Sequence, residues 1–395
     1  MDKQQATQDR KDEETWNNAR HTMQGCYDYL TNFPSGKYIA EARQKIDEWH
    51  RQEMINQAAR RDILDKIKKI PNLYSPKQIL DFLSNDTITQ ADLTDCGIPQ
   101  SVINNLPYTT SPRLAFGETP TEIPSGYTEV YFWGLYGSGI TCALGALLNT
   151  AAHFGYLAIA PGPGSIYAAQ LKNIFNRDWD CMLPAPTPVG VLQYLPFTLK
   201  KVEEKRPRYI SLIEKCGGEI LKCFFRRVSG SPQPSQTHED TFNLLIRFLK
   251  SDNRKIHFFV IDYDKENRTD IEGLTLSDYL SATATFLNHN DIFRKTTDAI
   301  YVIVSKSDLM PCMKEERAEY AKRYLEENYR TFINVLESYC KKYRLNDLSI
   351  IPFSLGNVYF QQICDFDRES SMQILDILIN RVKPRKRSIL DILFK

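Results

Sequence analysis

Apolar residues recur at helical spacing in the first part of the chain. One such stretch runs from Trp16 to Leu30, and a second runs from Tyr38 to Trp49 after a turn rich in small and polar residues. This pattern predicts a helical hairpin over residues 15–51. Residues 1–14 are almost all polar or charged, so we expect them to form a frayed polar arm.

Residues 52–107 continue the helical pattern in shorter segments. Ser75 with Pro76, and separately Thr89, stand where an N-cap and a first-turn proline are expected. Gly97 can end a helix, because glycine adopts the left-handed conformation at little cost. This region predicts a small helical adaptor domain, and its side chains show no catalytic pattern.

After residue 127 the pattern changes to short runs of β-branched and aromatic residues. Residues 108–127 are rich in Pro, Thr, Ser and Gly and are predicted to form a linker. The later runs alternate with helical stretches, which predicts an α/β domain over residues 128–382 and leaves 383–395 as a basic and apolar tail. The runs are 128–133, 208–213, 256–261, 299–304 and 348–352.

A glycine-rich loop follows the first of these runs and leads into an apolar helix. It contains Gly134, Gly137, Ser138, Gly139, Ile140 and Thr141. The spacing is that of the phosphate-binding pattern GxxxxGK[ST], with Ile140 in place of the lysine. Backbone N–H groups of such a loop can face a phosphate, and the Thr141 hydroxyl can reach Mg²⁺. Taken alone, the loop is equally consistent with a tight turn.

Three further motifs follow later strands, in chain order. They are Glu214 with Gly217, then Ser305, Lys306 and Asp308, then Ser354 and Leu355. Each stands at the carboxyl end of a predicted strand, where open α/β sheets bind their ligands. The order and the strand context together make a chance arrangement improbable.

The four motifs resemble those of translation-factor and Ras-type P-loop GTPases. The resemblance covers residues 128–382 and implies a Ras-like α/β fold, a mostly parallel sheet with helices on both faces. It implies GTP or GDP and Mg²⁺ as ligands, with Asp308 accepting hydrogen bonds from guanine, Lys306 along the base, and a backbone N–H near Ser354 and Leu355 at its O6. The hairpin is similar to a tetratricopeptide repeat, and the combination is similar to GTPase-like modules fused to helical adaptors in bacterial conflict and signalling systems.

The sequence departs from this family at positions that matter for activity. Ile140 cannot offset phosphate charge as the lysine does, and Gly218 stands where Ras-type members carry the glutamine that orients water. Glu214 keeps the carboxylate of the metal-side aspartate but is one methylene longer. Thr187 is the nearest counterpart of the switch threonine, so Thr141 and Thr187 are the expected Mg²⁺ ligands.

Composition narrows the classes of function. The chain has 50 Lys and Arg against 49 Asp and Glu, a net charge of +1, which gives no support to nucleic-acid binding. The nine cysteines form no CxxC pair, and we expect reduced thiols, no zinc site and a cytoplasmic protein. The polar start is not a secretory signal.

We therefore expect a degenerate GTPase that acts as a scaffold or weak guanine-nucleotide sensor and meets protein partners through residues 15–107. One alternative is an active switch whose missing charge comes from Lys215, Lys306 or an arginine of a second subunit. The other is a pure interaction module with a collapsed pocket, with Ile140 packed into its own loop and no cofactor. Residues 227–240 are expected to be an irregular insertion, and residues 313–343 an exposed amphipathic helix. A solvated or packed tail is favoured over membrane contact.

Overall fold

The computed structural model divides into two compact units, residues 1–107 and residues 108–395, and each is described by itself. The first unit is helical, and the second combines helices with a central sheet. The structure describes residues 2–109, 111, 114–135, 137–176, 181–185, 192–215, 217–231, 236–263 and 273–385. Thr187 and the end of the C-terminal tail, residues 386–395, lie outside the described residues.

Six α-helices, from 6 to 31 residues long, build the part of the first unit that the structure describes. Ser75 caps α4 with Pro76 in its first turn, and Thr89 caps α5, as the sequence predicts. Gly97 follows α5 with φ +85°, a conformation that glycine adopts without strain. The helices are α1 (Asp2–Ala19), α2 (Met23–Asn32), α3 (Ile39–Lys69), α4 (Pro76–Ser84), α5 (Gln90–Asp95) and α6 (Gln100–Asn105).

The N-terminal residues differ from the predicted frayed arm, because α1 begins at Asp2. Asp12 is buried and accepts hydrogen bonds from the Tyr29 hydroxyl and, at 2.8 Å, from the backbone N–H of Lys37. Trp16 packs on Tyr29 with ring centroids 5.1 Å apart. These tertiary contacts fix a polar segment whose own sequence gives little helical signal. The helix predicted from Trp16 to Leu30 is also interrupted, since Thr22 caps a new helix there.

We expect Asp12→Ala to loosen α1. The change leaves the buried Tyr29 hydroxyl and the Lys37 amide without their acceptor, which costs about 1–3 kcal/mol. Limited proteolysis should then cut within residues 2–19 faster than in the unchanged protein. Glu13→Ala, at an exposed neighbouring position, is the matched control and should leave the cleavage rate unchanged.

The second helix of the predicted hairpin is longer than the sequence suggested. It was expected to end near residue 51, whereas α3 continues to Lys69. Residues 50–62 are exposed, and side-chain pairs one turn apart accompany them, such as Gln52 with Asn56 at 2.9 Å. The segment contains no Gly or Pro and is rich in helix formers, so helix propensity carries the helix beyond the buried stripe.

A seven-stranded sheet forms the centre of the second unit. Its order is β2-β4-β5-β1-β6-β7-β8. Neighbours from β5 to β8 are parallel, whereas β4 runs antiparallel to β5 and β2 runs antiparallel to β4. From β4 to β8, this order with these directions is that of the Ras-like GTPase fold, with β2 as an added edge strand, so the predicted fold class is confirmed. The sheet strands are β1 (Thr128–Trp133), β2 (Leu157–Ala158), β4 (Leu192–Leu199), β5 (Arg208–Lys215), β6 (Arg254–Asp262), β7 (Thr297–Ser305) and β8 (Ser349–Phe353).

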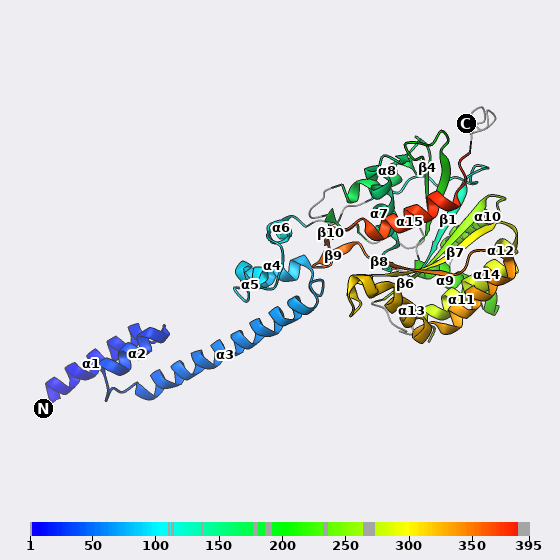
Figure 1. Ribbon diagram of the computed structural model, residues 1–395. Helices are drawn as coiled ribbons and strands as arrows, with labels where there is room; N and C mark the ends of the chain where they lie inside the picture. Colours follow the sequence, from blue (N-terminus) through cyan, green and yellow to red (C-terminus); the bar gives the residue numbers. More distant parts are fainter. Residues whose placement is uncertain are drawn as a thin grey trace. The chain divides into compact units, whose positions relative to one another are not determined.

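Helices cover both faces of this sheet (Figure 1). Side chains of β1 alternate between the two cores: Val130 and Phe132 join one, Tyr131 and Trp133 the other. The core of Val130 is closed by α7 (Ile140–His153), α8 (Ser165–Ile174) and α15 (Glu369–Arg381). The core of Trp133 is closed by α9 (Gly217–Ser229), α10 (Gln236–Leu249), α11 (Leu276–His289), α12 (Ile292–Lys295), α13 (Arg317–Asn328) and α14 (Arg330–Tyr343). A small second sheet has the order β3 (Cys181–Met182), β10 (Ile363–Phe366), β9 (Gly356–Tyr359).

Two predicted segments of this unit differ from the structure. Residues 227–240 were expected to be irregular, yet α9 continues to Ser229 and α10 begins at Gln236, so only the connection holds the Gly and Pro residues. Residues 313–343 were expected to form one exposed amphipathic helix, and they form two helices, α13 and α14, with Leu325 and Phe332 fully buried. The apolar face of each helix packs into the core of Trp133.

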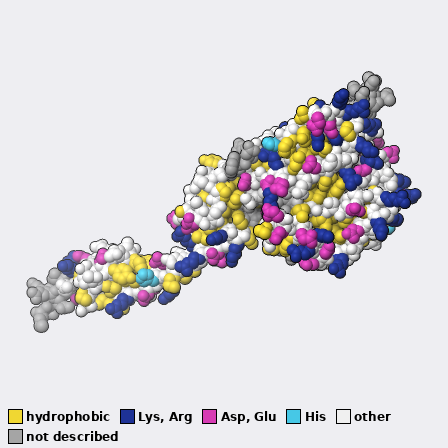
Figure 2. All heavy atoms as spheres, viewed as in Figure 1, with side chains coloured by type: hydrophobic (Ala, Val, Ile, Leu, Met, Phe, Trp, Pro, Cys, Tyr) yellow, Lys and Arg dark blue, Asp and Glu magenta, His cyan; other side chains and the backbone are white. Residues whose placement is uncertain are grey.

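The segment predicted as a linker, residues 108–127, is part of the second unit. The Thr119 hydroxyl donates to the carbonyl of Leu192 at 2.7 Å, and Ile123 is buried in the core of Trp133. On the face of this unit shown in Figure 2, basic and acidic side chains are interspersed, which agrees with the net charge of +1. Within the described residues, no helix combines the length and apolar character needed to cross a membrane.

Candidate functional site

The four motifs meet at one edge of the sheet. The glycine-rich loop follows β1, Glu214 is near the end of β5, Lys306 follows β7, and Ser354 follows β8. These strands are parallel within the sheet, so their carboxyl ends share an edge. The structure thus brings the sequence-predicted residues together as a candidate ligand site.

The glycine-rich loop has the backbone form that its sequence requires. Gly137 and Gly139 have φ values of +75° and +81°, and Gly139 directly precedes α7. At Gly134 an added Cβ would stand 2.9 Å from the Val260 carbonyl oxygen, so no side chain fits there. Ser138 is buried, and its hydroxyl donates to the Leu135 carbonyl at 2.7 Å.

Ile140 takes the position of the phosphate-binding lysine but faces inward. Its side chain is 7% exposed and belongs to the core closed by α7, α8 and α15. Its Cδ1 lies 3.2 Å from the point where a Cβ on Gly134 would stand. The loop therefore packs its own apolar side chain beneath itself, and the sequence places no Lys or Arg between residues 134 and 141.

Glu214 lies on the side of the site that was expected to bind Mg²⁺, and it accepts hydrogen bonds from other residues of the protein. Glu214 is 1% exposed, its Oε1 accepts from the Thr141 hydroxyl, and its Oε2 accepts from the Tyr167 hydroxyl at 2.6 Å. In a Mg²⁺ site of this fold the threonine hydroxyl and the carboxylate side would both serve the ion. Here they are hydrogen bonded to each other, and Tyr167 donates to the second carboxylate oxygen.

Tyr167 was missed by the sequence analysis. It lies in the first turn of α8, directly after the turn of residues 161–164, and it is fully buried. A single tyrosine after a Pro- and Gly-rich turn gives no signal for contact with Glu214, which lies 47 residues later in the chain. Gly217, expected in the same motif as Glu214, is the first residue of α9.

The side of the site that was expected to bind the base contains Asp308 and Ser354. Asp308 lies close to the Ser354 side chain. Burial raises the pKa of Asp308 above its ordinary value, although Ser354, Arg317 and Lys306 oppose the shift. The Ser354 hydroxyl oxygen also accepts from the Gly356 N–H at 3.0 Å, which orders the loop that holds Leu355.

Lys306 has a partner that the sequence analysis did not assign to it. Its Nζ lies 3.0 Å from Oδ2 of Asp262, which is fully buried at the end of β6. Lys306 itself has φ +56° and precedes a single 3-10 turn (Ser307–Leu309), while Ser305 is buried at the end of β7. This ion pair holds the Lys306 ammonium at the carboxyl end of β6. In the sheet, β6 lies between β1, which leads into the glycine-rich loop, and β7, which leads to Asp308.

No family model and no curated protein matches this chain. Among solved structures, 45 chains match. Nucleolar GTP-binding protein 1 of Plasmodium falciparum is 11% identical with a TM-score of 0.30, over 65% of this chain and 89% of that one.

Two other matching structures also concern GTP-binding proteins. The signal recognition particle receptor complex with GTP from Chaetomium thermophilum is 14% identical with a TM-score of 0.29, over 60% of this chain and 94% of that one. The GTP-bound GTPase-like domain of Ski7 from S. cerevisiae is 14% identical with a TM-score of 0.33, over 67% of this chain and 52% of that one, about half its length. The fold of the present chain is assigned from the order and direction of its own strands.

Proposed function

We propose that this chain is a pseudo-GTPase: a Ras-fold module that binds guanine nucleotide weakly and without Mg²⁺, does not hydrolyse it, and assembles with protein partners. The observation that carries the proposal is the Glu214 carboxylate. Both of its oxygens accept hydrogen bonds from protein hydroxyls, those of Thr141 and Tyr167. We infer that hydrogen bonds to protein hydroxyls, rather than a metal ion, hold the longer Glu214 side chain in place.

The phosphate side supports weak binding and no turnover. Losing a charge-assisted hydrogen bond of about 1.5–3 kcal/mol lowers affinity at least about tenfold, and Ile140 supplies none. Catalysis depends still more on positive charge placed where negative charge develops. Lys306, one candidate to replace the missing lysine, is ion-paired with Asp262 at 3.0 Å.

The base side supports selectivity for guanine. A carboxylate at Asp308 can accept hydrogen bonds from the N1–H and N2–H groups of guanine, whereas adenine offers no matching pair of donors. The neighbouring Ser354 favours the charged form of this carboxyl group. Rejection of adenine follows because its binding would leave the buried carboxylate unpaired.

The helical unit would supply the partner contact. The α2–α3 hairpin is similar to a tetratricopeptide repeat, and repeats of that type bury a face against a neighbour. In this unit Trp16 of α1 covers the hairpin core. The exposed residues 50–62 of α3 include Met54 and Ile55, which are 72% and 56% exposed and offer apolar anchors to a partner.

Thermal melting of the full chain with GTP, GDP or ATP tests the proposal. A ligand that binds only the folded state stabilises it, by about 2.7 kcal/mol at one hundred times its Kd. We expect GTP and GDP, but not ATP, to raise the melting temperature equally in Mg²⁺ and in EDTA. Asp308→Asn should remove the shift and leave the melting temperature of the free protein close to the original. A shift that requires Mg²⁺ would contradict the proposal.

Guanine binding should depend on pH through Asp308. Burial raises its pKa above the ordinary 3.8, so protonation begins at a higher pH than for an exposed aspartate. Protonation removes an acceptor that guanine needs, so the GTP-induced melting shift should shrink as pH falls through the raised pKa. The shift measured at decreasing pH should be compared with that of Asp308→Asn, whose response should be flat.

A second candidate function rests on Ile140. Its side chain packs beneath its own loop against Gly134, as expected for a pure interaction module with a collapsed pocket. That module would show no melting shift with any nucleotide, at any concentration up to the millimolar range. The same melting experiment therefore separates the two functions.

A further inference from the structure

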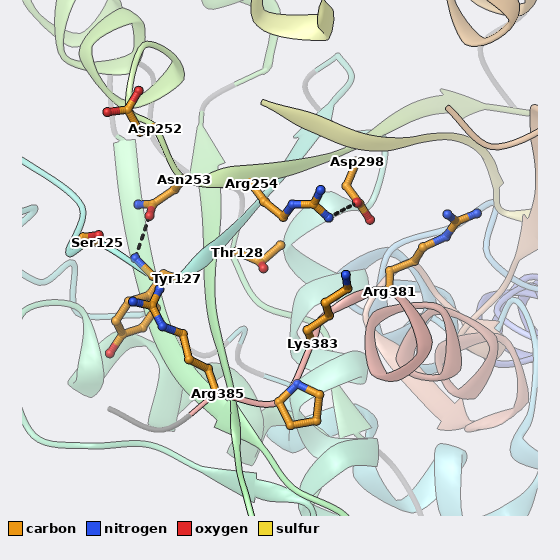
Figure 3. Close-up of a pocket in the computed structure, with 12 residues that line it drawn as sticks. Ser125, Tyr127, Thr128, Asp252, Asn253, Arg254, Asp298, Arg381, Lys383 and Arg385 are labelled. Atoms are coloured by element: carbon orange, nitrogen blue, oxygen red, sulfur yellow. Dashed lines mark hydrogen bonds and ion pairs between the residues drawn. The ribbon is translucent and has the colours of Figure 1, made fainter. Parts of the chain in front are cut away.

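A cavity of about 290 Å³ opens at the opposite edge of the sheet from the glycine-rich loop. Thr128 and Arg254, which begin β1 and β6, form one side of it. The chain segment after α15 forms the other side with Lys383 and Arg385 (Figure 3). β1 has six residues, so the cavity and the loop lie about 20 Å apart along the strand.

The cavity is lined by more positive than negative charge. Arg254, Arg381, Lys383 and Arg385 line it, against the carboxylates of Asp252 and Asp298. Arg254 is already paired, with its Nη1 2.5 Å from Oδ1 of Asp298. Among the described residues no carboxylate forms an ion pair with Lys383 or Arg385, and both are exposed. Figure 3 shows the Lys383 ammonium and the Arg254 guanidinium around the same space as Thr128.

Two of these cations, Arg385 and Arg381, have contacts that position them. The Arg385 N–H donates to the Pro207 carbonyl at 2.9 Å, and its guanidinium lies over Gly126, where an added Cβ would be 2.1 Å from Nη1. The Gly126 N–H in turn donates to Oδ1 of Asn253 at 2.8 Å. Arg381 is held by a hydrogen bond from its Nε to the Tyr301 hydroxyl at 3.0 Å. A cavity with cations already in place loses little entropy when an anion binds.

We propose that this cavity binds an anion that carries two or more phosphate groups. Guanidinium groups match phosphate oxygens in pairs, and a lysine adds a point charge, so the lining suits phosphates better than a single carboxylate. The volume exceeds what one inorganic phosphate fills. The proposal does not depend on nucleotide binding at the glycine-rich loop.

The test uses the full chain and presents clustered phosphate groups in two forms, a soluble compound and a lipid headgroup. Inositol trisphosphate is titrated by calorimetry, and phosphatidylcholine vesicles containing phosphatidylinositol bisphosphate are tested by co-sedimentation. Lys383→Gln with Arg385→Gln should weaken binding about tenfold or more, because two charge-assisted contacts are lost. Lys322→Gln with Lys341→Gln removes the same charge from exposed positions of α13 and α14 and should leave binding within about twofold of the original, since distant surface charges are screened.

The outcomes separate the sources and can overturn the site. Binding of the soluble probe that depends on Lys383 and Arg385 supports a free phosphorylated ligand. Binding to vesicles alone, with the same dependence, supports a lipid headgroup at the same site. If neither probe binds, or if the Lys322 and Lys341 variant loses as much affinity, the cavity is not a phosphate site.

Discussion

Lys255→Met should lower the free energy of unfolding by about 3–5 kcal/mol, because it leaves a buried carboxylate without its positive partner. Lys255 and Glu129 are both fully buried, with Nζ 3.5 Å from Oε2. The ammonium also donates to the backbone carbonyls of Ser251 and Asn253 at 2.7 and 2.8 Å. Glu129 in turn accepts from the Tyr131 hydroxyl at 2.6 Å. This network joins the starts of β1 and β6, which are central strands, so removing it destabilises the centre of the sheet.

Urea unfolding of the full chain, followed by near-ultraviolet circular dichroism, measures this effect. The control is Lys314→Met, which removes a half-exposed ammonium 2.7 Å from Asp367. Exposed pairs contribute about 0–1 kcal/mol, so the control should change little. Burial lowers the pKa of Lys255, which shows that its charge is held against a desolvation cost. If Lys255→Met lowers the free energy of unfolding by less than Lys314→Met does, Lys255 and Glu129 do not act as a coupled buried pair.

The second large effect is a gain of affinity. Ile140→Lys combined with Glu214→Asp should raise GTP affinity at least about tenfold and make it depend on Mg²⁺. The lysine restores a charge for the phosphates. The shorter carboxylate withdraws from Thr141 and leaves space between them for a metal ion.

Calorimetric titration with GTP, in Mg²⁺ and in EDTA, measures the GTP affinity of the double variant and of each single variant. Ile140→Met is the matched control for packing, because it keeps an apolar side chain in the same core. It should fold as the original does and gain no affinity. If the double variant folds, as its circular dichroism would show, and binds GTP no better, then Ile140 and Glu214 are not what limits the site.

The sequence was a good guide to the site where the chemistry lies at strand ends. Asp308 and Ser354 stand after parallel neighbouring strands, and such ends meet at one edge whatever the intervening helices do. The contact of Tyr167 with Glu214 could not be found this way, because a lone tyrosine carries no local signature of a partner far along the chain. The pairing of Lys306 with Asp262 was hidden for the same reason.

The fold likewise contains features that local sequence predicted and features that depend on distant contacts. Caps at Ser75 and Thr89 act within one helical turn, so their sequence signature was sufficient. Helix α1 needed the buried Asp12, whose partner Tyr29 is 17 residues away, and a polar segment gives no sign of such a contact. The long α3 followed from helix propensity alone, which an analysis of apolar spacing undervalues.

Release of phosphate from GTP in Mg²⁺, followed over a range of protein concentrations, tests the pseudo-GTPase most directly. The Glu214 network and the buried Ile140 predict no release above that of buffer at any concentration, and no change on Asp308→Asn. Release that depends on Mg²⁺ and increases more steeply than protein concentration would show that a second subunit completes the site. That result would make the chain an active GTPase and contradict the account given for Glu214.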